Sequence, residues 1–127
     1  MKVVKTAAML AVLLSLVAIL WAFDTKSKTE SVKGYVIDSA CAFTKGLQKP
    51  ISADCATACA KAGSPLVILT ANGTIYWPIT DTTPSSSQNE KLLPFAGQKV
   101  TASGKVFERG GSRAMVIEKI EPQAEAK

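Results

Sequence analysis

The stretch KVTASGKVFERGGSRAMVIEKI, residues 99–120, determines the expected fold. Its two halves, KVTASGKVF (99–107) and AMVIEKI (114–120), are predicted strands separated by a glycine-rich turn. Gly110 and Gly111 in that turn can adopt positive φ without steric cost. Gly104 lies inside the first strand, which indicates a β-bulge or a sharp bend. The C-terminal part of the domain is therefore predicted to be a bent β-hairpin.

Three further strands are predicted before this hairpin. VKGYVID (32–38) has the residue alternation of a strand and is rich in β-branched and aromatic residues. PLVILT (65–70) and TIYWPI (74–79) flank Asn72-Gly73, the strongest short-range hairpin signal. Five short, bent strands in roughly 90 residues predict a mainly β domain, a small five-stranded and partly open barrel resembling the OB-fold.

A short helix is predicted after the first strand, within ISADCATACAKAG (51–63). Ser52 is a favourable N-cap and Asp54 complements the helix dipole in the first turn. Gly63 can end the helix, so we expect it at residues 53–62. A helix at this place departs from the OB pattern, whose helix lies between strands three and four. In that second place we expect one helical turn that plugs the core, around Leu92, Leu93 and Phe95.

Residues 1–23 are predicted to be a membrane-targeting segment outside the barrel domain. Lys2 and Lys5 precede an uncharged run of 18 residues, 6–23. At ~1.5 Å per residue a helix of this run is roughly 27 Å long, close to a thin hydrocarbon core. Trp21 and Phe23 at its outer end favour a signal anchor over the alternative, a cleaved signal peptide. Residues 24–31 are then a linker, 32–122 the barrel domain and 123–127 a polar tail.

Either form of this segment places the domain outside the cytoplasm, anchored in the membrane through residues 6–23 or released by cleavage. Exported domains meet an oxidising compartment, where disulfides persist. The chain has a net charge of +5, and without Lys2 and Lys5 it keeps 13 basic and 10 acidic residues, a net of +3. That excess is too mild to imply a nucleic-acid partner.

The chain contains no histidine. This excludes Ser-His-Asp and Cys-His catalysis, His-ligated haem and mixed Cys/His zinc sites. Asp38, Asp54 and Asp81 are candidates for an acid–base pair by residue type alone. Each of them has a structural role that needs no catalysis. Asp54 complements the dipole at the start of the predicted helix, and Asp81 lies in a polar loop. Asp38 is expected to accept hydrogen bonds from turn N–H groups. We therefore expect neither a catalytic set nor a cofactor.

Three cysteines remain as candidate site residues: Cys41, Cys55 and Cys59. A Cys55–Cys59 disulfide is disfavoured, because helical i, i+4 Cβ atoms lie ≈ 5–6 Å apart and a disulfide needs ~3.8 Å. A disulfide from Cys41 to Cys55 or to Cys59 closes a loop of about 15 to 19 residues, which is worth roughly 3 kcal/mol. The alternatives are a soft-metal or redox site built from all three thiols, a disulfide to a partner, and three unpaired buried thiols.

The motifs of the exported domain resemble those of a group of small exported, mostly uncharacterised bacterial proteins with an OB-like β-barrel. The shared pattern is G-x-V-x-D-x-x-C followed by C-A-x-x-C-x-x-x-G-x-P-L, G-x-x-Y and A-G-x-x-V-x-x-x-G-x-V. Its positions here are Gly34, Asp38, Cys41, Cys55, Ala56, Cys59, Gly63, Pro65, Leu66, Gly73, Tyr76, Ala96, Gly97, Val100, Gly104 and Val106. Many such proteins carry a histidine where this chain has Ser52, which weakens a Cys-and-His metal site. The resemblance implies fold and location: the bacterial inner membrane, with the domain on the periplasmic or extracytoplasmic side.

Three functions stay open at this point. The favoured one is a non-catalytic, membrane-anchored binding or accessory domain that contacts a protein partner in a larger membrane complex, with Tyr76 or Trp77 as contact residues. The second is a thiol-based metal-binding or redox protein that uses the three cysteines. The third and weakest is a single-strand nucleic-acid binder, which the export signal and the low charge oppose.

Overall fold

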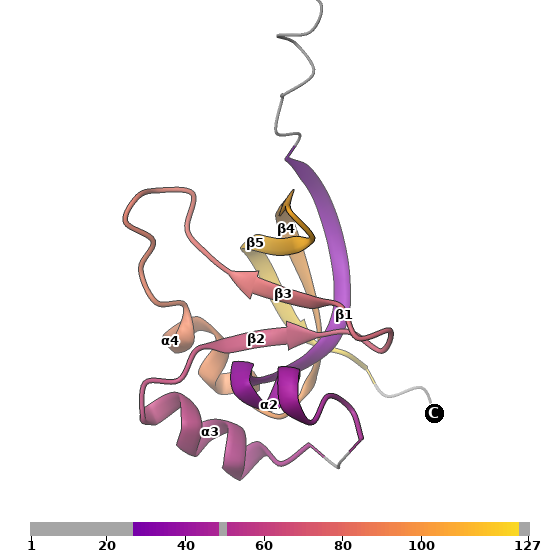
Figure 1. Ribbon diagram of the computed structural model, residues 1–127, viewed down its shortest axis with the longest axis vertical. Coiled ribbons are helices and arrows are strands. Elements are labelled where there is room, and N and C mark those ends of the chain that lie inside the picture. Colours follow the sequence, from indigo (N-terminus) through magenta and orange to yellow (C-terminus); the bar gives the residue numbers. More distant parts are fainter. Residues whose placement is uncertain (1–26, 49–50, 125–127) are drawn as a thin grey trace, which may run out of the picture.

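Five strands form a closed barrel in the computed structural model, which describes residues 27–48 and 51–124 (Figure 1). Their order around the barrel is β1-β2-β3-β5-β4, and every pair is antiparallel except β3–β5. The mainly β, five-stranded prediction is confirmed, but the barrel is closed and not partly open. The strands are β1 (Lys28–Asp38), β2 (Leu66–Leu69), β3 (Ile75–Pro78), β4 (Lys99–Arg109) and β5 (Ser112–Pro122).

The β4–β5 hairpin is bent at the position that the sequence indicates. The register shifts between Ser103 and Gly104, so Glu118 on β5 has no partner opposite it. A Cβ atom on Gly104 would lie 1.9 Å from the Val116 carbonyl oxygen, which shows why only glycine fits. The bulge lets the long strands β4 and β5 curve enough to close a small barrel.

The core of the barrel consists of apolar side chains from β1, β2, β4 and β5 and of the Tyr76 ring from β3. Val36, Ile68, Val100 and Met115 are fully buried within it. Helix α4 (Asn89–Leu92) and the 3₁₀ turn η2 (Leu93–Phe95) follow the polar loop and insert Leu92, also fully buried, into the same core. The predicted helical plug is therefore confirmed.

Helix α3 (Ala53–Lys61) lies where the sequence predicts a helix. The Ser52 hydroxyl accepts a hydrogen bond from the Cys55 N–H at 3.2 Å, and Gly63 has a φ of +98° just after the helix. A second helix, α2 (Ser39–Thr44), follows β1 directly and was not predicted from the sequence. Both helices carry cysteines and lie side by side at one end of the barrel (Figure 1).

Strand β1 begins at Lys28, so residues 28–31 are not a linker as expected but pair with β4. The predicted anchor or signal, 1–23, lies outside the described residues. Within 27–48 and 51–124, no helix is long and apolar enough to cross a membrane.

Candidate functional site

Asp38 is the polar centre of the barrel end that carries the cysteines. Its side chain is buried, with 4% exposure, and its Oδ1 accepts from the Cys41 N–H at 2.9 Å, which caps α2. Its Oδ2 accepts from the Ser64 hydroxyl, just beyond α3. The expectation that Asp38 binds turn N–H groups is confirmed. One carboxylate therefore joins the start of α2 to the segment after α3.

The ionisation of Asp38 depends on a balance between burial and hydrogen bonding. Burial alone raises the pKa of this carboxyl, but the hydrogen bonds from Ser64, Cys41 and the Ala40 N–H outweigh it. The net result is a pKa below the ordinary value of 3.8. Asp38 is therefore charged at neutral pH although it is buried.

All three cysteines are free, so the disulfide predicted from Cys41 to Cys55 or Cys59 is absent from this structure. Cys41 is half-buried on α2, while α3 carries the exposed Cys55 and the half-buried Cys59. The hydrogen bond that joins Cys41 to Asp38 comes from the Cys41 backbone N–H, in the first turn of α2.

The surroundings keep two of these thiols protonated. Burial raises the pKa of the Cys41 thiol, the nearby Lys45 ammonium opposes that shift, and the Asp38 carboxylate reinforces it. Burial, Asp38 and Cys55 in the same way raise the pKa of Cys59. Thiolates are the nucleophiles and the metal ligands among cysteine forms, so these raised values disfavour both roles. In the two described ranges no group of three or more His, Cys, Asp or Glu side chains is arranged to hold a metal ion.

A small cavity lies between α2 and α3. Its volume is about 100 Å³, and both the Cys41 and the Cys55 side chains line it. The remaining lining residues are Ile37, Asp38, Lys45, Gly46, Ile51, Ser52 and Ala56. Cys59 is not among them, so the structure brings only two of the three candidate cysteines to one cavity.

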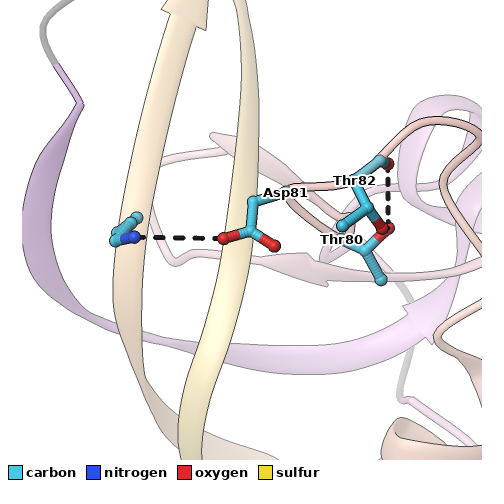
Figure 2. Close-up of polar contacts among 4 residues, drawn as sticks. Thr80, Asp81 and Thr82 are labelled. Carbon is cyan, nitrogen blue, oxygen red and sulfur yellow. Dashed lines mark hydrogen bonds and ion pairs between the residues drawn. The ribbon is translucent and has the colours of Figure 1, made fainter.

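The three candidate carboxylates belong to different parts of the fold. Asp54 is exposed in the first turn of α3, as expected. Figure 2 shows Asp81 in the loop after β3, where its carboxylate lies 4.0 Å from the Lys105 ammonium on β4. Next to it, the Thr80 hydroxyl donates to the Thr82 carbonyl oxygen at 3.2 Å. No hydrogen bond or ion pair in the described part of the chain joins two of these carboxylates.

Tyr76 and Trp77, the two candidate partner contacts, point to opposite sides of β3. Tyr76 is a core residue with 5% exposure, and its hydroxyl accepts from Arg113 Nη1 at 3.1 Å. Strand alternation directs its ring inward, so most of this side chain is withdrawn from solvent. Trp77 is half-buried and meets Phe43 of α2, with 6.1 Å between ring centroids.

Phe43 is the functional candidate that the sequence analysis missed. Its side chain is 67% exposed, the most exposed large apolar side chain in the described residues. Phe43 and Trp77 line a groove of about 390 Å³, which we call the aromatic groove. Its other lining residues are Gly73, Thr74, Ile75, Glu108, Gly111, Ser112 and Arg113. Only the unexpected helix α2 brings Phe43 to this groove, so the sequence offered no signal for it.

Asn89 is a second residue whose role the sequence did not reveal. Its Oδ1 accepts from the Leu66 N–H at 2.9 Å, and its Nδ2 donates to the Ser64 carbonyl at 2.8 Å and to the Ala60 carbonyl at 3.4 Å. One side chain of α4 thus holds the end of α3 and the start of β2. This bracing fixes α3 on the barrel and, with it, one wall of the cysteine cavity.

Comparison with known proteins adds nothing to this geometry. No family model, no curated protein and no solved structure matches the chain. The functional conclusion therefore depends on the residues and their arrangement.

Proposed function

We propose that the chain is a non-catalytic binding domain, an OB-like barrel that residues 6–23 hold on the extracytoplasmic side of a bacterial inner membrane. It would serve there as an accessory subunit of a larger membrane complex. The strand order β1-β2-β3-β5-β4 and the helical plug between β3 and β4 support the OB-like assignment. The uncharged N-terminal run supports the anchor.

The aromatic groove is the observation that carries the binding function. OB barrels bind their ligands on the face formed by strands 2 and 3, between the connections β1–β2 and β4–β5. Phe43 comes from the first of these connections, Trp77 from β3, and Ser112 from the start of β5 beside the second. Single exposed apolar residues are common on protein surfaces. An exposed phenylalanine against a tryptophan in a groove at this face is better explained by a bound partner.

The charges of the aromatic groove favour a protein over a polyanion. Arg113 Nε lies 3.2 Å from the Glu108 carboxylate, so the two charged side chains that line this groove among the described residues neutralise each other. A single-strand nucleic-acid site needs a positively charged groove beside its stacking rings. The proposed partner is accordingly a protein of the same membrane.

We expect Phe43→Ala to reduce recovery of the chain in its native membrane complex by at least about tenfold, as for an aromatic hot spot. Leu47→Ala is the matched control, since Leu47 follows α2, is 39% exposed and does not line the groove. The measurement is native electrophoresis of solubilised membranes, together with a photo-reactive phenylalanine analogue at position 43 or 47. A lone monomer, or equal cross-linking from both positions, would contradict the proposed function.

A thiol-based site is the second candidate, favoured by the cavity that Cys41 and Cys55 share. If this candidate is correct, the chain purified without chelators carries a soft metal in stoichiometric amount, or oxidation joins these two cysteines. Elemental analysis measures the metal, and non-reducing intact-mass analysis after alkylation measures the disulfide. Three alkylated thiols and no metal in protein isolated from the membrane would eliminate this candidate.

A further inference from the structure

Strand β1 is paired on both sides over only part of its length. On one side it pairs with β4 from Lys28 to Tyr35, and on the other it pairs with β2 only from Tyr35 to Asp38. Figure 1 shows the N-terminal part of β1 extending past the β2–β3 hairpin. Residues 28–34 therefore have a sheet partner on one side only.

The direction of the backbone groups follows from Val36. Its N–H donates to the Gln98 carbonyl at 3.1 Å, and its carbonyl accepts from the Gly97 N–H at 2.7 Å, so both groups point toward the β4 side. Backbone groups alternate in direction along a strand of an antiparallel sheet. The register with β4 is continuous from Lys28 to Tyr35. The N–H and C=O groups of Thr29, Ser31 and Lys33 must then point away from β4.

These outward backbone groups have no partner among the described residues. The pairing with β2 stops at Tyr35, and no backbone or side-chain hydrogen bond reaches Thr29, Ser31 or Lys33 from the β2–β3 turn. A groove of about 390 Å³ lies along this edge. It is lined by Glu30, Ser31, Val32, Lys33, Thr70, Ala71, Asn72, Thr74, Tyr76 and Arg113. We call these residues the β1-edge groove, and Thr74 and Arg113 also line the aromatic groove.

We propose that the β1-edge groove binds an extended segment of a partner polypeptide, which adds to the barrel as a further strand beside Thr29–Lys33. This inference rests on the proposed binding function and names the form of the partner. A row of unpaired N–H and C=O groups on alternate residues repeats every ~6.8 Å, twice the rise per residue of a strand. Only another extended polypeptide presents donors and acceptors at that repeat.

The surroundings of the edge suit such a segment. Glu30 and Lys33 carry opposite charges, and the third charged residue of this groove, Arg113, is paired with Glu108, so the edge has no bias toward a polyanion. The polar side chains of Thr29, Ser31 and Lys33 keep the empty edge soluble, which is how exposed edges avoid aggregation. Because the two grooves share Thr74 and Arg113, one partner can place a strand on β1 and an apolar side chain against Phe43.

Proline at position 31 tests the proposal, because it removes an N–H that points away from β4 and so costs the barrel no hydrogen bond. The full chain in detergent micelles is used to select peptides from a display library of random linear sequences. We expect selected peptides to bind Ser31→Pro at least about tenfold more weakly, and Ser31→Ala within about twofold of the unsubstituted chain. Peptide binding should slow amide exchange at Thr29, Ser31 and Lys33 but not at Glu30 and Val32, whose amides already pair with β4.

Each other outcome overturns the inference. The inference is wrong if the selected peptides bind Ser31→Pro and Ser31→Ala equally well, or if the selection enriches no peptide. It is also wrong if the amides are protected from exchange only when the chain self-associates, because the edge would then bind a second copy of this chain. If Ser31→Pro does not fold, amide exchange in the unsubstituted chain tests the inference instead. Bound peptide must then slow exchange at Thr29, Ser31 and Lys33 but not at Glu30 and Val32. Loss of cross-linking at position 43 would instead contradict the proposed function itself, so the two failures are distinguishable.

Discussion

Gly104→Ala is expected to destabilise the barrel by about 3–5 kcal/mol, a large part of the 5–15 kcal/mol that holds a domain folded. The added Cβ would lie 1.9 Å from the Val116 carbonyl oxygen and 3.0 Å from the Glu118 nitrogen. Both are backbone atoms of β5, so no rotamer change relieves the clash. The hairpin must give up its bulge or separate its strands, and either change opens the barrel.

The measurement is urea unfolding followed by far-ultraviolet circular dichroism. Gly110→Ala is the matched control in the same hairpin, since Gly110 has a φ of +56° but no atom within 4 Å of an added Cβ. Gly110→Ala should lower the free energy of unfolding by only about 1–2 kcal/mol, which is the strain of a residue with a side chain in the left-handed conformation. A Gly104→Ala variant no less stable than Gly110→Ala would show that the bulge is not rigid.

The elements that the sequence predicted are those that local chemistry determines. The bulge at Gly104 and the helix capped by Ser52 depend on residues a few positions apart, and both lie where expected. The hairpin glycine Gly73 likewise has the positive φ, +86°, that such a turn needs. These signals were sufficient to predict five strands, and hence a small barrel.

The parts that were missed depend on long-range contacts. Helix α2 forms because Asp38, at the end of β1, caps it and is itself held by Ser64, 26 residues away. Asn89 reaches back 23 residues to Leu66. The disulfide prediction used loop length and helical Cβ spacing, neither of which determines how α2 and α3 pack, and all three cysteines are free in this structure. Phe43 became a candidate only when α2 placed it against Trp77.

Asp38→Asn should destabilise the domain by about 1–3 kcal/mol at neutral pH, because it removes a charged acceptor that caps α2 and binds Ser64. The pKa of Asp38 is lower in the folded chain than its ordinary value of 3.8. The charge therefore adds stability above the unfolded pKa, and this stability is lost as the pH falls through the folded pKa. Urea unfolding from neutral to acidic pH should show the two proteins converging in stability.

The same substitution should make the thiols more reactive. The Asp38 charge contributes to the raised pKa of Cys41 and of Cys59, so its removal lowers both and increases the thiolate fraction at a given pH. Alkylation of each cysteine, followed by mass spectrometry across a pH series, should show rate profiles that shift to lower pH. Local unfolding would instead speed alkylation at every pH without moving the profile. Asp54→Asn, on the exposed first turn of α3, is the control that should leave Cys41 unchanged. An unshifted Cys41 profile in Asp38→Asn would mean that this carboxylate does not keep the thiol protonated, and the thiol-based candidate would gain support.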